Sequence, residues 1–328
     1  MHHVVRVGVF LAASFLLQVA NAADAPSGSG RVKALKITIL STMLADGDSL
    51  GEWGFSALVE ADGHRFLFDT GAHTDIVRRN AQTLKIDLST VPEAILSHSH
   101  SDHVTGFIPL RDLLREKTPT ALARTHVAEG IFYPRPIAST GLSGNPVLLF
   151  KPEYEKGGGE FIVHQKPVEL YPGIWLTGPV PRKYPERNWS HSRNDQVMTP
   201  AGLAEDNLPE DMSLICDTEE GLVVLTGCGH AGVINIIEHA RNSVRDVRVH
   251  ALIGGLHLFN ASEESLAWTA GKLREFGVQN FLGAHCTGLE TVYRYRHDLG
   301  LDRAHAVVAA VGSSFELGKG IDPGFIAR

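Results

Sequence analysis

Short apolar runs alternate with amphipathic segments along most of the chain. The runs at 34–42 and 249–258 are rich in β-branched residues and lie between turn residues, as is typical of buried strands. The segments 233–244 and 262–277 instead repeat apolar residues at the spacing of a helix, and Ser262 is a suitable N-cap for the second segment. The pattern therefore predicts strands that alternate with helices.

Two segments predict strand pairs joined by a tight turn. Residues 53–72 have the pattern strand, turn and strand around Asp62-Gly63, and residues 212–226 repeat it around Gly221. Further strands are expected at 121–130, 280–286 and 305–312, and helices at 108–116 and 288–299. The apolar strands lack a strict two-residue alternation, which indicates sheets that are covered by helices. We therefore expect an α/β fold built as a sandwich of two sheets flanked by helices.

The first 22 residues have the pattern of a cleavable signal peptide. Arg6 precedes an apolar run at 7–20, and Ala20-Asn21-Ala22 is a suitable cleavage site. The run is short for a membrane span, so no stable membrane insertion is expected after the signal is cut behind Ala22. The pattern predicts a periplasmic or secreted protein.

The rest of the chain is expected to form one domain. Residues 23–33 are small and polar and predict an N-terminal tail, which leaves residues 34–328 for the domain. Within it, residues 131–200 carry many of the prolines and a run of three glycines at 157–159. We interpret this region as inserted loops that fold over the functional site as a lid.

Composition supports a folded domain and narrows the range of partners. The chain is 43% hydrophobic and 20% charged, which allows a sizeable core. A net charge of −7 and a pI near 6.2 disfavour a nucleic-acid-binding surface, so a small-molecule substrate is expected. The three cysteines, Cys216, Cys228 and Cys286, are an odd number, and a disulfide framework is not expected. No pattern indicates an oligomeric state.

The stretch 94–107 concentrates candidate metal ligands. A short apolar strand delivers His98, His100, Asp102 and His103 to a loop. Side chains two residues apart in an extended loop project to the same side, so His98 and His100 are placed to hold one ion. Asp102 and His103 follow after a turn and suit a second ion. Two ions about 3.5–4 Å apart would let a bridging water lose a proton near neutral pH and act as a nucleophile.

Three later strands are each expected to end at a histidine, namely His230, His257 and His285. Strand ends that meet at one edge of stacked sheets can bring such side chains together. Asp69 ends another strand beside a glycine turn, and we predict that it orients the ligand loop through hydrogen bonds. Histidines with one carboxylate suit zinc, although iron and manganese accept the same donors.

These residues and their motifs resemble the metallo-β-lactamase superfamily. The motifs are FDTGA (68–72), SHSHSDH (97–103), TGCGHAG (226–232) and GAHCTG (283–288). Together with IGGLHL and the closing VGSSFEL, they resemble in particular the dihydropterin/ribofuranosylaminobenzene 5′-phosphate synthase-like branch. The resemblance implies a four-layer αββα sandwich of two mixed sheets, with a site for one or two ions at its edge. The ion in such sites is usually zinc and sometimes iron or manganese.

The resemblance also implies roles for single residues. It implies two ligand sets, a first of His98, His100 and His230 and a second of Asp102, His103 and His285. The chain departs at two places from the pattern of the hydrolytic members of the superfamily. Asn207 or Asp211 stands near the position of a histidine that many of these members have. Cys228 stands where they have a bridging aspartate. Either Cys228 bridges the ions as a thiolate, or the His230 side chain takes the place in space of both the histidine and the aspartate. His257 is a further candidate, as a metal ligand or as a catalytic contact to a substrate oxyanion.

The function that these inferences favour is that of an exported metal-dependent hydrolase. A metal-bound hydroxide would attack an ester, lactone, amide or phosphoester, and Asp102 would serve as both ligand and proton acceptor. The predicted lid would bind the substrate through Trp189, His191 and Arg193. The alternatives are a pterin-related transferase, an iron-dependent redox enzyme and a binding protein without activity. Export disfavours the transferase, because pterin phosphates are cytosolic metabolites.

Overall fold

We describe the protein from a computed structural model, which describes residues 1–2, 30–137, 139–140, 143–188 and 195–327. Nearly all of the predicted signal peptide, residues 1–22, lies outside the described residues. The last residues of the predicted tail are not free, because Val32 is buried and its N–H donates to Asp217 O at 2.8 Å. Among the described residues, no helix has the length and apolar character needed to cross a membrane.

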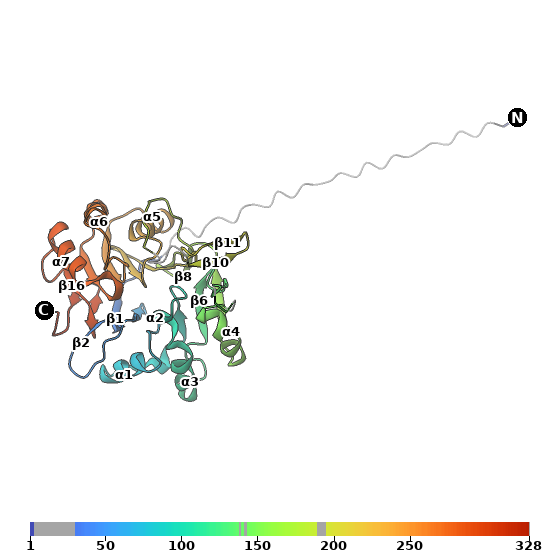
Figure 1. Cartoon of the computed structure of the whole chain (residues 1–328), viewed down its shortest axis with the longest axis horizontal. Helices are drawn as coiled ribbons and strands as arrows, with labels where there is room; N and C mark the ends of the chain where they lie inside the picture. The colour runs from blue at the N-terminus through green and yellow to red at the C-terminus, as the bar shows by residue number, and fades with distance from the viewer. Residues whose placement is uncertain (3–29, 138, 141–142, 189–194, 328) are drawn as a thin grey trace.

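Two mixed sheets form the centre of the molecule (Figure 1). The first sheet contains, in spatial order, β19 (Gly320–Asp322), β18 (Ser314–Glu316), β1 (Leu35–Ser41), β3 (Ser56–Ala61), β4 (His64–Phe68), β5 (Glu93–Ile95), β6 (Arg124–Ala128) and β7 (Glu160–His164). The second contains β16 (Ala306–Val308), β15 (Asn280–Gly283), β14 (Val249–Gly254), β13 (Gly221–Thr226), β12 (Leu214–Thr218), β9 (Ile174–Leu176) and β8 (Val168–Tyr171). Two short pairs stand apart from them, β10 (Gln196–Thr199) with β11 (Gly202–Glu205) and β17 (Ala310–Val311) with β2 (Leu44–Ala45).

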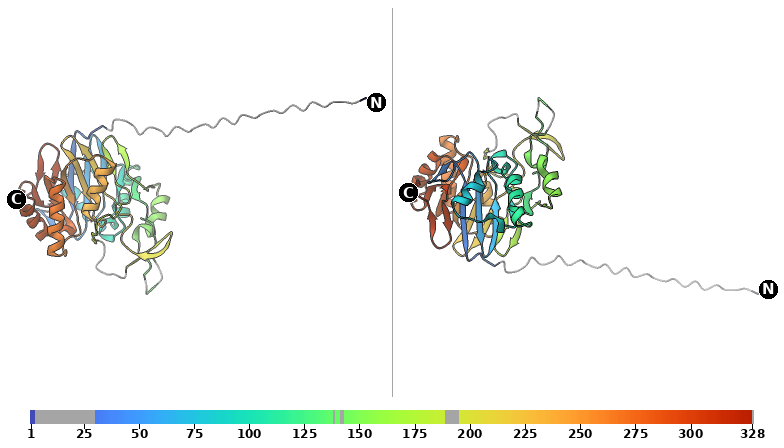
Figure 2. Two further views of the ribbon diagram at one scale, coloured as in Figure 1. Left: turned by 90° about the horizontal axis from the view of Figure 1, so that it is seen from above. Right: turned by 90° about the horizontal axis from the view of Figure 1, so that it is seen from below.

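Helices cover the outer faces of both sheets (Figure 2). They are α1 (Ile76–Thr83), α2 (Ser101–Val104), α3 (Phe107–Lys117), α4 (Pro146–Lys156), α5 (Val233–Ser243), α6 (Glu263–Glu275) and α7 (Leu289–Asp298), with 3-10 turns at η1 (Leu88–Thr90) and η2 (His285–Thr287). One apolar cluster joins α1, α3 and α4 to the first sheet, and another joins α5, α6 and α7 to the second. The order of layers is therefore helix, sheet, sheet and helix, which confirms the predicted αββα sandwich.

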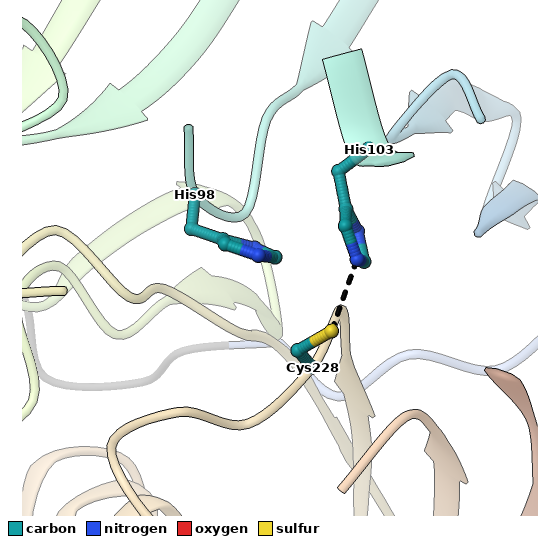
Figure 3. A group of neighbouring side chains, drawn as sticks. All are labelled: His98, His103 and Cys228. Atoms are coloured by element: carbon teal, nitrogen blue, oxygen red, sulfur yellow. Dashed lines mark hydrogen bonds between the residues drawn. The ribbon is translucent and has the colours of Figure 1, made fainter. Parts of the chain in front are cut away.

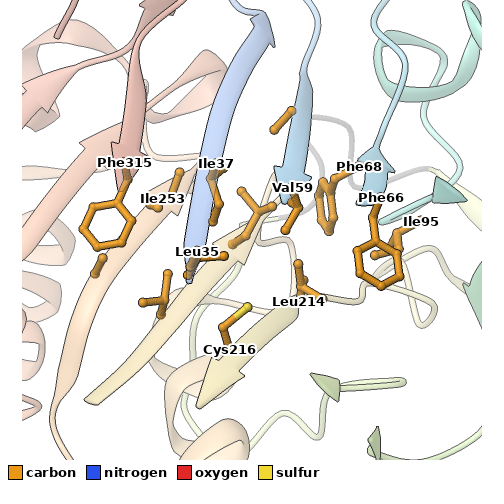
Figure 4. Close-up of a cluster of buried hydrophobic side chains, with 14 of the residues drawn as sticks. Leu35, Ile37, Val59, Phe66, Phe68, Ile95, Leu214, Cys216, Ile253 and Phe315 are labelled. Atoms are coloured by element: carbon orange, nitrogen blue, oxygen red, sulfur yellow. The ribbon is translucent and has the colours of Figure 1, made fainter. Parts of the chain in front are cut away.

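The core between the sheets explains why they pack face to face. Ile37 and Phe66 of the first sheet and Leu214 and Ile253 of the second belong to one cluster of buried side chains (Figure 4). Burial of such side chains stabilises a fold by about 25 cal/mol per Å² of apolar surface. The two sheets are thus held together mainly by the apolar faces of their strands.

The helices predicted from the sequence, α3, α5, α6 and α7, begin and end within two residues of their expected bounds. The Ser262 hydroxyl accepts a hydrogen bond from Ser265 N at 3.2 Å at the start of α6, and Gly277 has a φ of 68° just beyond its end. The predicted pairs are also present, since β3 pairs with β4 and β12 with β13, both antiparallel. These features depend only on neighbouring residues, so local patterns are enough to predict them.

Two expectations differ from the structure. Residues 131–200 were expected to form loops, but they contain α4 and four strands, and β7, β8 and β9 pair within the two main sheets. The strands expected to end at His230, His257 and His285 end earlier, at Thr226, Gly254 and Gly283. Gly254, the last residue of β14, has a φ of 111°, and a Cβ at this position would lie 2.0 Å from Thr226 O, so the strand ends at a position that requires glycine.

Candidate metal centre

One triad of histidines combines donors from both sheets. His98 and His100 lie in the loop after β5, and His230 lies in the loop after β13. The ring centroids are 4.7 Å apart for His98 and His100, 4.7 Å for His98 and His230, and 4.8 Å for His100 and His230. Their nearest ring nitrogens all lie within 4.8 Å of one another, so the three imidazoles are placed to hold one ion.

A second triad lies beside the first. Asp102 and His103 belong to α2, and His285 begins the 3-10 turn after β15. Asp102 Oδ2 lies 3.2 Å from His285 Nε2 and 4.0 Å from His103 Nε2. The rings of His98 and His103 are 4.2 Å apart at their centroids, so the two triads share one edge of the sandwich.

Cys228 lies between the two triads. Its sulfur is 3.0 Å from His103 Nε2, and His98, His103 and Cys228 form another group of donors within 4.8 Å of one another (Figure 3). This is the position at which the resemblance implies a bridging aspartate in hydrolytic relatives. Asp211 does not belong to any donor group of the described residues, because its carboxylate accepts the N–H of Ala231 at 2.8 Å. His230 thus lies in the first triad and Cys228 lies between the triads.

The chemistry of these donors fits a metal ion. His98 Nε2 and His230 Nε2 are buried and have no hydrogen-bond partner among the described residues. A buried polar atom without a partner is costly, and an ion at this position would satisfy both nitrogens. Burial also lowers the pKa of His98 and His230 well below the usual value, which keeps both rings neutral, as a metal ligand must be.

The neighbouring carboxylates favour positive charge at the second triad. Burial alone would lower the pKa of His103, but Asp69 and Asp102 outweigh it and raise that pKa to about 9. Without an ion, the two carboxylates therefore favour the protonated form of the His103 ring. A divalent cation at the second triad would take over that charge and release the proton.

Asp69 orients the ligand loop. Its Oδ1 accepts a hydrogen bond from Ser97 N at 2.8 Å, and its Oδ2 accepts one from Ser97 Oγ at 2.6 Å and lies 2.7 Å from His103 Nδ1. Ser97 Oγ also lies 2.9 Å from His98 Nδ1. Hydrogen bonds to the nitrogen that faces away from an ion fix the ring and its tautomer. Gly227 is needed nearby, because a Cβ at this position would lie 2.1 Å from Ser97 Oγ.

Three residues at the centre have a strained backbone. Asp69, His257 and His285 have φ values of 54°, 48° and 46°, in the left-handed region that side chains other than glycine rarely adopt. Such conformations cost about 1–3 kcal/mol each and cluster at functional sites. The fold therefore holds these three residues in place against the preference of their backbone for a negative φ.

His257 and Cys286 lie next to the triads. The His257 ring is 4.6 Å from the His230 ring at their centroids, and the His257 N–H donates to Cys286 Sγ at 3.2 Å. Cys286 Sγ lies 3.2 Å from Cys228 Sγ. Cys286 was not predicted as a ligand from the sequence, although it directly follows the candidate ligand His285.

A cavity of about 500 Å³ opens beside His257. Its wall includes Glu186, Asn188 and Trp268, and it is large enough for a small molecule. The predicted substrate contacts Trp189, His191 and Arg193 lie outside the described residues, so their role stays a prediction. The cavity meets the donor groups of the described residues through His257, and it lies on the side of the triads where this residue stands.

Comparisons with known proteins identify the relatives of this chain. The family model of the metallo-β-lactamase superfamily matches residues 54–228, which is more than half of the chain. A 7,8-dihydropterin-6-methyl-4-(β-D-ribofuranosyl)-aminobenzene-5′-phosphate synthase from Methanocaldococcus jannaschii is 27% identical over 292 residues, covering 84% of this chain and 96% of the relative.

Solved structures agree with this family match. The crystal structure of Tm1679, a metal-dependent hydrolase of the β-lactamase superfamily, has a TM-score of 0.64 at 25% identity, covering 81% of this chain and 93% of that one. The metallo-β-lactamase fold protein YhfI from Bacillus subtilis has a TM-score of 0.54 at 12% identity, covering 87% of this chain and 100% of that one. The second likeness concerns the fold alone.

Proposed function

Because this chain belongs to the metallo-β-lactamase superfamily, we propose that it is a metal-dependent hydrolase of a small molecule with an ester, lactone, amide or phosphoester bond. The observation that carries the proposal is the pair of donor triads, which lie side by side at one edge of the sandwich. Two ions held there would supply Lewis acidity and a water of lowered pKa. Imidazoles with one carboxylate suit zinc, which we propose as the ion.

The residues of the chain have separate tasks in this proposal. Asp102 is the carboxylate within the triads, so it holds the second ion and is the group that can receive a proton there. The cationic His103 and the hydrogen bond to His285 outweigh burial and hold the pKa of Asp102 below its usual range, which makes it a better ligand than base. His257 lines the cavity, which supports its role as the residue that meets the substrate.

Metal content and hydrolysis together test the proposal. The protein purified without chelator should contain at least two zinc ions per chain by elemental mass spectrometry, one for each triad. It should hydrolyse at least one member of a panel of aryl esters, lactones and phosphodiesters. A His98→Ala, His103→Ala double variant should lose both metal and activity, and activity that survives loss of the metal would contradict the mechanism. Iron in place of zinc would favour the redox alternative.

The synthase from Methanocaldococcus jannaschii supports a second candidate function. That relative is matched over 96% of its length, so its reaction class is a reasonable alternative for this chain. In that case the ions would stabilise negative charge while a diphosphate leaves a pterin substrate. Release of diphosphate from a dihydropterin diphosphate, without hydrolysis of the ester panel, would favour the transferase.

We also propose that the chain is exported. The signal-peptide pattern of the first 22 residues supports this proposal. Cell fractionation of the expressed full chain should find a mature protein that begins at Ala23. A chain that keeps its first residues and stays in the cytoplasm would contradict export and would remove the main objection to the pterin substrate.

A further inference from the structure

Three neighbouring parallel strands each deliver one more donor to the same edge. β13, β14 and β15 lie side by side in the second sheet, and Cys228, His257 and Cys286 follow their carboxyl ends by two or three residues. The ring nitrogen and the two sulfurs lie within 4.8 Å of one another. None of these three residues lies in the segment 98–103 after β5, which supplies two donors to each triad.

The two sulfurs are placed differently from an ordinary buried thiol. Cys216 belongs to the apolar cluster between the sheets, which is the usual environment of a buried cysteine. Cys228 and Cys286 are equally buried, but they belong to none of the apolar clusters of the described residues. Their sulfurs instead lie 3.2 Å apart and face polar groups.

The backbone around Cys286 is shaped to bring donors to its sulfur. The His257 N–H points at this sulfur, and the φ of 48° at His257 holds the histidine in a conformation that few residue types adopt easily. A side chain at Gly255 would come within 2.9 Å of Cys286 Sγ, so glycine leaves room for the sulfur. The loop after β14 is thus built around this atom.

We propose that Cys228, His257 and Cys286 form a third metal site, for a thiophilic divalent ion such as Zn²⁺. Two thiolates and one imidazole are a donor set that zinc accepts, and three protein ligands leave a fourth position free. His257 lines the cavity, so that position is next to the space for the substrate. Binding converts the two thiols to thiolates and releases their protons to the solvent.

The third site goes beyond the proposed hydrolysis and does not depend on it. Cys228 is shared, because its sulfur also belongs to the donor group with His98 and His103. Cys286 belongs only to the third site, so it is the residue whose replacement separates this site from the two triads. Metal binding can therefore be tested without any substrate.

Cobalt binding to the full chain tests the site directly. Metal is removed with a chelator under a phosphine reductant, and Co²⁺ is then titrated into wild type, Cys286→Ser and the matched control Cys216→Ser. We expect Cys286→Ser to bind one ion fewer per chain than wild type and to lose part of the thiolate-to-cobalt charge-transfer absorption. Cys216→Ser should match wild type in both measurements.

A second variant decides the question if Cys286→Ser fails to fold. His257→Asn removes the nitrogen donor, and asparagine tolerates the left-handed backbone at this position. It should lose the same single ion, with an unchanged circular dichroism spectrum. Equal cobalt binding in Cys216→Ser and His257→Asn would overturn the proposal. A Cys228–Cys286 disulfide in the protein as isolated would also overturn it. Such a disulfide would lower the mass by two hydrogen atoms and leave one reactive thiol after unfolding.

Discussion

The sulfur of Cys228 lies 3.0 Å from Nε2 of His103, within hydrogen-bonding distance of the nitrogen that the second triad offers to an ion. A sulfur donor at this position would make the centre softer, because sulfur prefers zinc to magnesium or manganese. The other nitrogen of the same ring lies 2.7 Å from Asp69 Oδ2, so the ring is fixed from both sides.

Replacing Asp69 by asparagine should weaken metal binding without unfolding the chain. The amide cannot accept all the hydrogen bonds from Ser97 and His103, while asparagine tolerates the φ of 54° at this position. We expect metal affinity to fall by roughly 10–100-fold. Competition with a coloured chelator measures the change, with Asp112→Asn on the surface of α3 as the control. Equal affinities in both variants would show that Asp69 does not position the ligands.

Replacing His230 by alanine should remove one ion and leave the other. His230 is the donor that the second sheet contributes to the first triad, whereas the second triad keeps all its members. Elemental mass spectrometry should find about one metal ion fewer per chain than in wild type, and hydrolysis should fall by about 10²-fold or more because one of two ions is lost. His305→Ala, at an exposed position, is the control. Unchanged metal content would remove His230 from the ligand set.

Acid should destabilise the protein through His164. Burial and the neighbouring His126, whose Nδ1 lies 3.0 Å from His164 Nε2, lower the pKa of His164 to about 4. The unfolded chain, with a pKa near 6.5, then binds more protons than the folded chain between about pH 6.5 and 4, so stability falls as the pH drops through this window.

Urea unfolding at pH 7 and pH 5 measures the contribution of His164. We expect His164→Gln to flatten the pH dependence by about 1–2 kcal/mol, while His305→Gln, at an exposed site, keeps the slope of wild type. A slope that is the same in all three proteins would assign the acid sensitivity to other groups.

Replacing Trp268 by alanine should affect substrate binding but not the ions. Trp268 lines the cavity beside His257 and belongs to none of the donor groups. For a substrate found in the hydrolysis panel, we expect KM to rise by about 10-fold with kcat little changed, the sign of lost ground-state binding. Tyr293→Ala, an exposed aromatic position on α7, is the control. A fall in kcat with normal KM would place Trp268 in the chemical step instead.

The sequence allowed prediction of the features that depend on neighbouring residues. A few adjacent residues determine each of three such features, namely the caps of α6, the turn at Asp62-Gly63 and the ligand loop before α3. The positions of β7, β8 and β9 were missed, because the residues of β7 and β8 are mostly half-buried and their patterns differ little from those of loops. Their pairing depends on partners elsewhere in the sheets.

The candidate site was also predictable only in part. His98, His100, Asp102 and His103 stand together in the sequence, so their grouping could be expected from spacing alone. The approach of Cys286 to Cys228 depends on β14, which runs between β13 and β15 and sets their separation. No local pattern carries that information, and a buried cysteine is more often a packing residue.

Each triad takes two donors from the segment 98–103, which follows β5 of the first sheet, and one from the second sheet. An ion bound there would therefore act as a cross-link between the two halves of the chain. Its binding energy would add to the apolar contacts between the sheets, by an amount that grows with the free metal concentration. Metal supply would then set the resistance of this protein to proteolysis, and with it the protein's lifetime in a metal-poor environment.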